Sequence, residues 1–207
     1  MIGINRVMRV LITSDFLLNS GWGLIGPIFA IFITKQIEGG DIAMVGFVAA
    51  VFWFTKSIFQ PFIAHYLDRK KGEADDFKFL TRGFYVANLI PLGYFFATDI
   101  WHLFLLEFVR GVAMAFVLPS WMAIFTRHIE KGWEAFSWSI QNTVLGFAVG
   151  FAAAFGGVIT TYLGFKMVFI LVTLFGLIST TLLFRIKGYL IPQDHPALKI
   201  PPKELAF

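Results

Sequence analysis

The sequence lacks cysteine and is poor in charge. None of its 207 residues is cysteine, and Asp, Glu, Lys and Arg together make up 14%, against roughly 25% in soluble domains. Without cysteine the chain has no disulfide, no thiolate metal site and no thiol redox centre. A soluble protein of this size could not bury so large an apolar surface in one core, so a soluble enzyme and a disordered chain are excluded.

Sequence motifs of catalysis are missing as well. The sequence contains no HExxH, no GxSxG and no P-loop, the patterns that hold a zinc ion, a nucleophilic serine or a nucleotide phosphate. Its four histidines are not clustered for metal binding. We therefore expect a protein that is not an enzyme and carries no metal or other cofactor.

Apolar side chains are abundant. They make up 57% of the chain, which contains 26 Phe. A membrane-spanning helix needs about 20 mostly apolar residues, and six segments qualify: 7–33, 42–63, 79–97, 102–125, 135–163 and 165–184. We predict an all-α membrane protein, a bundle of six transmembrane helices within residues 1–187. Residues 188–207, which contain several prolines, read as a cytoplasmic tail.

The basic residues predict the orientation in the bilayer. Two lie between the segments on one side, Lys35 and Lys166, and thirteen lie on the other side. The thirteen are Arg6, Arg9, Arg69, Lys70, Lys71, Lys78, Arg82, Arg127, Lys131, Arg185, Lys187, Lys199 and Lys203. Because Lys and Arg accumulate in cytoplasmic loops, we expect a multi-pass protein of the plasma or inner membrane with both termini in the cytoplasm. The basic residues lie in loops between apolar runs, so the net charge of +4 does not indicate a nucleic-acid partner.

Four charged residues fall inside the apolar segments: Asp15, Lys56, Glu107 and Arg110. A charge within the hydrocarbon is costly, and each one is a functional hypothesis. Glu107 and Arg110 are three residues apart on one helix, so they share a face and can pair. Asp15 and Lys56 lie at similar depth on adjacent antiparallel helices, which makes an Asp15–Lys56 pair plausible.

The four charges differ in the role that we expect of them. Arg110 lies near mid-membrane, too deep to reach the surface easily, so we expect it to face an aqueous cavity. Glu107 serves to neutralise Arg110, and Lys56 has a structural or snorkelling role. Asp15 is the candidate for proton coupling, because carboxylates in low dielectric can exchange protons near neutral pH. A pair with Lys56 would weaken that role.

Asn19 and Trp22 follow Asp15 on one helical face and can line the same cavity. A second pattern consists of small residues in segment 135–163, namely Gly146, Gly150, Ala154 and Gly157. Such a stripe lets another helix approach closely. For Trp53 and Trp121, contact with lipid or core is the favoured interpretation in so aromatic a chain.

The loop after residue 63 resembles a signature of the major facilitator superfamily, G-x-x-x-D-R-x-G-R-R. Asp68 and Arg69 match that signature, Ala64 replaces its first glycine, and Gly72 comes one residue late. Downstream, Arg110-Gly111 is followed by Pro119, a spacing that the family often shows, and Glu107 stands where the family often has arginine.

The last two segments are similar to the same family. The stretch Gly156-Gly157, Gly164-Phe165-Lys166 and Phe169 resembles its GG…LG-[WF]-[RK]-x-x-F pattern. Ala152-Ala153 replaces the Gly-Pro of its antiporters, which weakly disfavours antiport. The resemblance covers roughly residues 5–187.

The resemblance implies a half-size transporter. Members of the family have twelve helices in two six-helix halves. The first and fourth helices of each half line the cavity, and the second and fifth meet the other half. By this resemblance Asp15, Asn19, Trp22, Glu107 and Arg110 line a transport cavity for a small-molecule substrate, and the glycine stripe contributes to a dimer contact. We expect a homodimer working by alternating access.

Two alternatives remain open at this stage. The chain can be a non-transporting membrane subunit that pairs with a different six-helix half or another partner protein. It can also be a fragment of a longer transporter, with its tail as the start of a linker.

Overall fold

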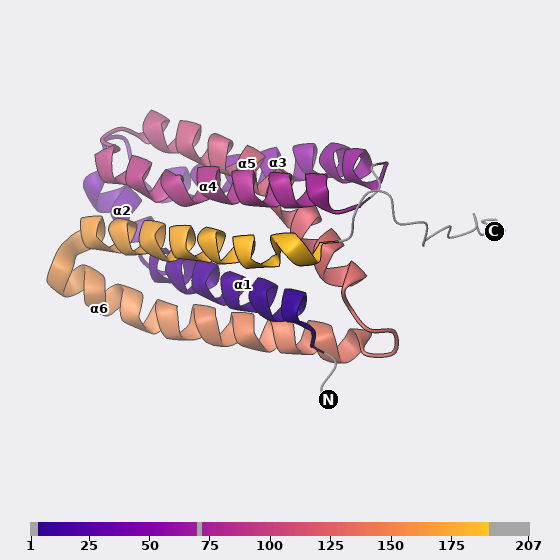
Figure 1. Cartoon of the computed structure of the whole chain (residues 1–207). Helices are drawn as coiled ribbons and strands as arrows, with labels where there is room; N and C mark the ends of the chain where they lie inside the picture. Colours follow the sequence, from indigo (N-terminus) through magenta and orange to yellow (C-terminus); the bar gives the residue numbers. More distant parts are fainter. Residues whose placement is uncertain (1–3, 70–71, 191–207) are drawn as a thin grey trace.

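The computed structural model describes residues 4–69 and 72–190, nearly all of them helical. The helices, shown in Figure 1, are α1 (Arg6–Ile25), α2 (Phe29–Gln36), α3 (Ile42–Asp68), α4 (Ala74–Phe96), α5 (Ile100–Arg127) and α6 (Glu134–Leu183), followed by the 3₁₀ helix η1 (Phe184–Tyr189). Lys70, Lys71 and the tail from residue 191 onward, with Lys199 and Lys203, lie outside the described residues. The predicted all-α bundle of six helices is confirmed.

The first predicted segment is divided. Helices α1 and α2 are separated by a turn at residues 26–28, and their axes differ by 40°. Pro27 interrupts the helix there because it has no backbone N–H to donate. By length and composition, α3, α5 and α6 are each apolar enough to cross a membrane, and α1 with α2 qualifies as one broken span. Helix α4, which covers nearly all of the predicted segment 79–97, is not among these spans, and it carries several charged residues in its first three turns.

Gly164 divides the 50-residue helix α6 into two legs. Its φ of +79° lies in the left-handed region, which glycine adopts without steric cost. The chain reverses direction there (Figure 1), so the legs α6a (134–163) and α6b (165–183) form a hairpin. The break lies at the residue where the sequence predicts it.

The turn between α4 and α5 is also where the sequence predicts it. Asp99 is the N-cap of α5, and its side chain accepts a hydrogen bond from the Trp101 N–H at 2.8 Å. The His102 ring completes a capping box by accepting from the Asp99 N–H at 3.2 Å. Such caps satisfy backbone donors that the first helical turn leaves free.

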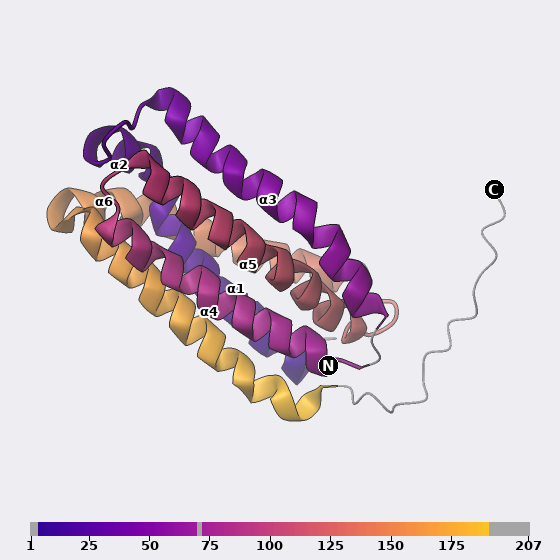
Figure 2. The same cartoon turned by 90° about the horizontal axis from the view of Figure 1, so that it is seen from above.

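Two helix pairs make up most of the bundle. Helix α1 packs mainly against α6, and α3 packs against α5. Helix α4 contacts both α5 and α6 and so joins the pairs on one side. Figure 2 shows α3 at the outer edge of the bundle, next to α5. Contacts between α1 and α5 are few, and two adjoining cavities described below lie between these helices.

Close packing joins α1 to leg α6a. A methyl group added at Gly23 would lie 2.8 Å from the Cβ of Ala152, and one added at Gly156 would lie 2.3 Å from the backbone oxygen of Leu24. The missing side chains therefore allow the two backbones to approach closely.

The predicted glycine stripe lies on another face of α6a. Gly146, Gly150 and Gly157 have no heavy atom of the described chain within 4 Å of an added Cβ, and Ala154 is exposed. Tight packing within the chain therefore does not use the stripe, and its role in a dimer stays a prediction.

The start of α1 and the end of η1 lie at the same end of the bundle, here named the basic end. Arg6 of α1 donates a hydrogen bond to the Tyr189 hydroxyl of η1. At the opposite end the α2–α3 and α4–α5 connections pair through Glu38 and Asp99, and the Lys166 ammonium lies 4.7 Å from the centre of the Phe95 ring.

Candidate functional site

A cavity of about 540 Å³ is bounded by α1, the start of α2, α3, α4 and α5. Five of the residues that the sequence singles out line it. The full lining is Leu18, Asn19, Trp22, Ile25, Gly26, Phe29, Ala49, Phe52, Trp53, Lys56, Tyr94, Glu107, Arg110 and Met114. We call it the central cavity.

The pair between Glu107 and Arg110 forms as their spacing predicts. Arg110 donates from Nε at 2.9 Å and from Nη2 at 2.5 Å to Oε2 of Glu107. The Tyr94 hydroxyl of α4 donates to the other carboxylate oxygen. Glu107 is only 1% exposed, and removing one partner of such a buried ion pair is strongly destabilising. The pair is electrically neutral as a unit.

Aromatic rings enclose the Arg110 guanidinium. Its carbon lies 4.5 Å from the centre of the Trp22 ring on α1 and 3.8 Å from that of Phe52 on α3. A planar, weakly hydrated guanidinium is suited to such ring contacts. Arg110 on α5 therefore contacts side chains of both α1 and α3 across the cavity.

The structure contradicts the expected Asp15–Lys56 pair. Lys56 lines the central cavity, where its ammonium lies 4.7 Å from the centre of the Trp53 ring, and it forms no ion pair within residues 4–69 and 72–190. Asp15 instead accepts hydrogen bonds from Asn19 at 3.0 Å and from Gln141 of α6. The reason is the packing: α1 lies against α6, whereas α3 lies against α5.

Asp15 lines a second cavity, of about 300 Å³, next to the first. The two cavities share Leu18, Asn19 and Met114 in their walls. Asn19 is thus a wall of one cavity and a hydrogen-bond partner of the carboxylate in the other. The polar residues predicted on the first and fourth helices are brought together along one face of the bundle.

Tyr94 belongs to this site although the sequence does not single it out, because a single hydroxyl in an apolar run does not reveal its partner. An amide inside a membrane segment, such as Gln141, is expected to line a cavity or to bond to a neighbouring helix, and Gln141 does bond to Asp15 on α1. Trp53, for which the sequence favours contact with lipid or core, lines the central cavity.

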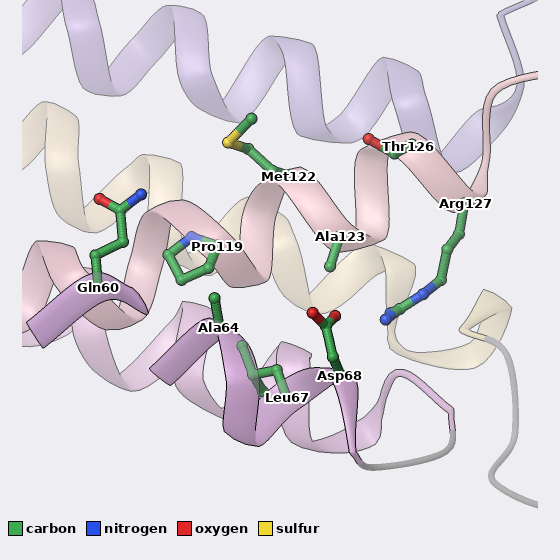
Figure 3. Close-up of a pocket in the computed structure, with 9 residues that line it drawn as sticks. All are labelled: Gln60, Ala64, Leu67, Asp68, Pro119, Met122, Ala123, Thr126 and Arg127. Carbon is green, nitrogen blue, oxygen red and sulfur yellow. The ribbon is translucent and has the colours of Figure 1, made fainter. Parts of the chain in front are cut away.

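The loop motif lies at the basic end. Asp68 is the last residue of α3, Arg69 is its C-cap, and Gly72 has a φ of +80°, a conformation that favours glycine. Asp68 lines a cavity of about 430 Å³ between α3 and α5. Figure 3 shows its carboxylate and the Arg127 side chain pointing into the same space from the two helices.

Arg127 pairs elsewhere, with acidic residues at the start of α4. It donates to Asp76, and it lies 4.0 Å from the carboxylate of Glu73. His128 Nδ1 lies 3.4 Å from the same Glu73 oxygen. Glu73 and Asp76 are 0% and 2% exposed, so this cluster ties the ends of α4 and α5 together. The neighbouring Asp75 pairs instead with Lys78, at 3.1 Å.

The comparison with known proteins agrees with this arrangement. No curated protein matches the chain. The model of one family, described as Major Facilitator Superfamily, matches residues 11–205, and six helices fit one half of such a transporter. The chain therefore belongs to the Major Facilitator Superfamily, a family of membrane transporters.

Proposed function

We propose that this protein moves small solutes across a cell membrane by alternating access, as a homodimer of six-helix halves. The observation that carries the proposal is the pair of adjoining cavities, whose walls hold Asp15, Asn19, Glu107 and Arg110 inside an apolar bundle. Buried charges are costly in a membrane and mark solute or ion pathways. A second copy would supply the opposite wall of the central cavity.

We further propose that Asp15 couples transport to protons. Its carboxylate accepts hydrogen bonds from two amides, Asn19 and Gln141, and forms no ion pair with any of the residues that the structure describes. An amide N–H can donate to a carboxyl oxygen of Asp15 whether Asp15 is ionised or protonated. An ammonium partner would instead favour the ionised form. Gaining or losing a proton would change the contact between α1 and α6a.

Proteoliposomes test this coupling. In Asp15→Asn we expect loss of solute uptake driven by a proton gradient, with exchange of solute across the membrane retained. The matched control is Asp75→Asn, a carboxylate at the basic end that pairs with exposed Lys78, and it should keep both activities. Undiminished proton-driven uptake by Asp15→Asn would remove Asp15 from the coupling step.

The homodimer rests on the glycine stripe and on α3. A Cβ added at Gly146, Gly150 or Gly157 would meet no atom of another described helix within 4 Å, and the apolar part of α3 is less buried than that of α5 or α6. Native mass spectrometry in lipid nanodiscs should find two chains per particle, and Gly150→Leu should shift the particle to one chain. Val86→Phe, which adds bulk at an exposed position of α4, should leave the dimer intact. A wild-type monomer in lipid contradicts the proposal and favours a partner subunit.

We also propose that the basic end faces the cytoplasm, because Lys and Arg concentrate there. The absence of native cysteine makes labelling simple. A cysteine introduced at Glu130, in the α5–α6 connection, should react with a membrane-impermeant maleimide only after the cells are opened. One introduced at Glu38 should react in intact cells, and the reverse pattern would invert the topology.

A further inference from the structure

We propose that the central cavity binds a small planar organic anion, such as an aromatic carboxylate, with Lys56 and Arg110 contacting its anionic group. This inference rests on the proposed transport function and names the substrate class of the same site. It departs from the structural role that the sequence suggests for Lys56.

The charged residues that line the central cavity do not balance. Arg110 and Glu107 cancel each other through two hydrogen bonds. Lys56 is the remaining charged residue of the lining, and no acidic residue other than Glu107 belongs to it. Lys56 has no ion-pair partner in the described part of the chain. The cavity therefore has a net positive charge, and a bound anion would compensate it.

The two cationic side chains of the lining, Lys56 and Arg110, lie close to each other. Phe52 and Lys56 are one helical turn apart on α3 and share a face. The Arg110 guanidinium lies over the Phe52 ring, with 3.8 Å between its carbon and the ring centre, so both cations border the same space. Arg110 uses Nε and Nη2 for Glu107, which leaves Nη1 to donate to a ligand. An ammonium and a guanidinium N–H beside one space suit a carboxylate.

The remaining wall of the central cavity contains several aromatic rings. Trp22, Phe29 and Trp53 are among its lining residues, and aromatic rings favour stacking or edge contacts with a second ring. The volume of about 540 Å³ lies in the usual range for small-molecule sites, about 300–1,000 Å³. A charged head with a flat apolar body matches this wall better than a sugar or a bare inorganic ion.

Binding can be measured without transport. We would titrate the full-length protein, in nanodiscs of zwitterionic phosphatidylcholine, with benzoate, neutral benzamide and cationic benzylamine, and follow tryptophan fluorescence and heat. Benzoate should bind saturably and at least ~10-fold more tightly than either analogue, because only benzoate compensates the positive charge. Equal affinity for the three probes, or preference for benzylamine, would overturn the proposal.

Variants assign the charge to Lys56. Lys56→Met keeps the apolar stem and should weaken benzoate binding at least ~10-fold, whereas Lys56→Arg should stay within about threefold of wild type because it keeps the charge. Lys35→Met, at an exposed position of the opposite end, is the control and should bind as wild type does. Melting curves exclude misfolded variants. Loss of binding in Lys56→Arg as well as Lys56→Met would refute recognition by charge.

Two further outcomes separate the possible sources of the anion and of failure. If nanodiscs containing phosphatidylglycerol change the fluorescence and benzoate does not, the cavity recognises a lipid head group and the proposal is wrong. Solute uptake by reconstituted protein that does not bind benzoate refutes the substrate class and leaves transport standing. Benzoate binding without any uptake supports the substrate class and contradicts the transport function.

Discussion

Two adjacent glycines of α6a should respond in opposite ways to the same substitution. An alanine methyl at position 156 would lie 2.3 Å from the backbone oxygen of Leu24, whereas one at position 157 would meet nothing within 4 Å. Carbon–oxygen contacts of about 3.3–3.6 Å are the normal lower range. Helix α1 and α6a would have to separate by about 1 Å in Gly156→Ala, and Gly157→Ala requires no movement.

The magnitude follows from two terms. Overpacking of a tight contact costs about 1–3 kcal/mol, and replacing a helical glycine by alanine gains about 1 kcal/mol. The second term is common to both variants and cancels in their difference. We therefore expect Gly156→Ala to be less stable than Gly157→Ala by about 1–3 kcal/mol, with Gly157→Ala at or above wild type.

The assay is reversible unfolding in mixed micelles with increasing dodecyl sulfate, followed by circular dichroism and by tryptophan fluorescence. The midpoint should move to lower detergent fraction for Gly156→Ala alone. Equal midpoints for the two variants would show that α1 and α6a are not in backbone contact at Leu24. A loss confined to Gly157→Ala would show that the other face of α6a carries the packing.

Two further substitutions probe polar contacts inside the bundle. Arg127→Met leaves the buried carboxylates of Glu73 and Asp76 without their guanidinium and should lower the free energy of unfolding by about 3–5 kcal/mol. The control Lys78→Met, in the exposed pair with Asp75, should change the free energy of unfolding by no more than about 1 kcal/mol. Equal effects of the two variants in the same unfolding assay would contradict this prediction. Asn88→Ala removes the amide that donates to the Gly176 carbonyl at 2.9 Å and to the Thr180 hydroxyl at 3.1 Å, so it should lower the free energy of unfolding by about 1–3 kcal/mol. An unfolding midpoint at the wild-type value would show that these groups find other partners.

The features that the sequence by itself determined are local ones. The apolar runs predict which parts are helical, and α3, α5, α6 and the broken span of α1 with α2 are apolar enough to cross a bilayer, which takes about 20 apolar residues. Gly164 and Asp99 lie between predicted segments, and their own backbone and capping preferences favour the two tight reversals there. The Glu107–Arg110 pair follows from a spacing of three residues on one helix. Each of these depends on residues close together in the chain.

Only the tertiary structure decided which helix faces meet. In a membrane, lipid and protein interior are both apolar, so hydropathy does not indicate how a helix is rotated about its axis. The tight contact therefore lies at Gly156, while a Cβ added at Gly157 would meet no other described helix within 4 Å. The same rotations place Asp15 against Gln141 instead of Lys56, and Lys56 lines the central cavity without an ion-pair partner among the described residues.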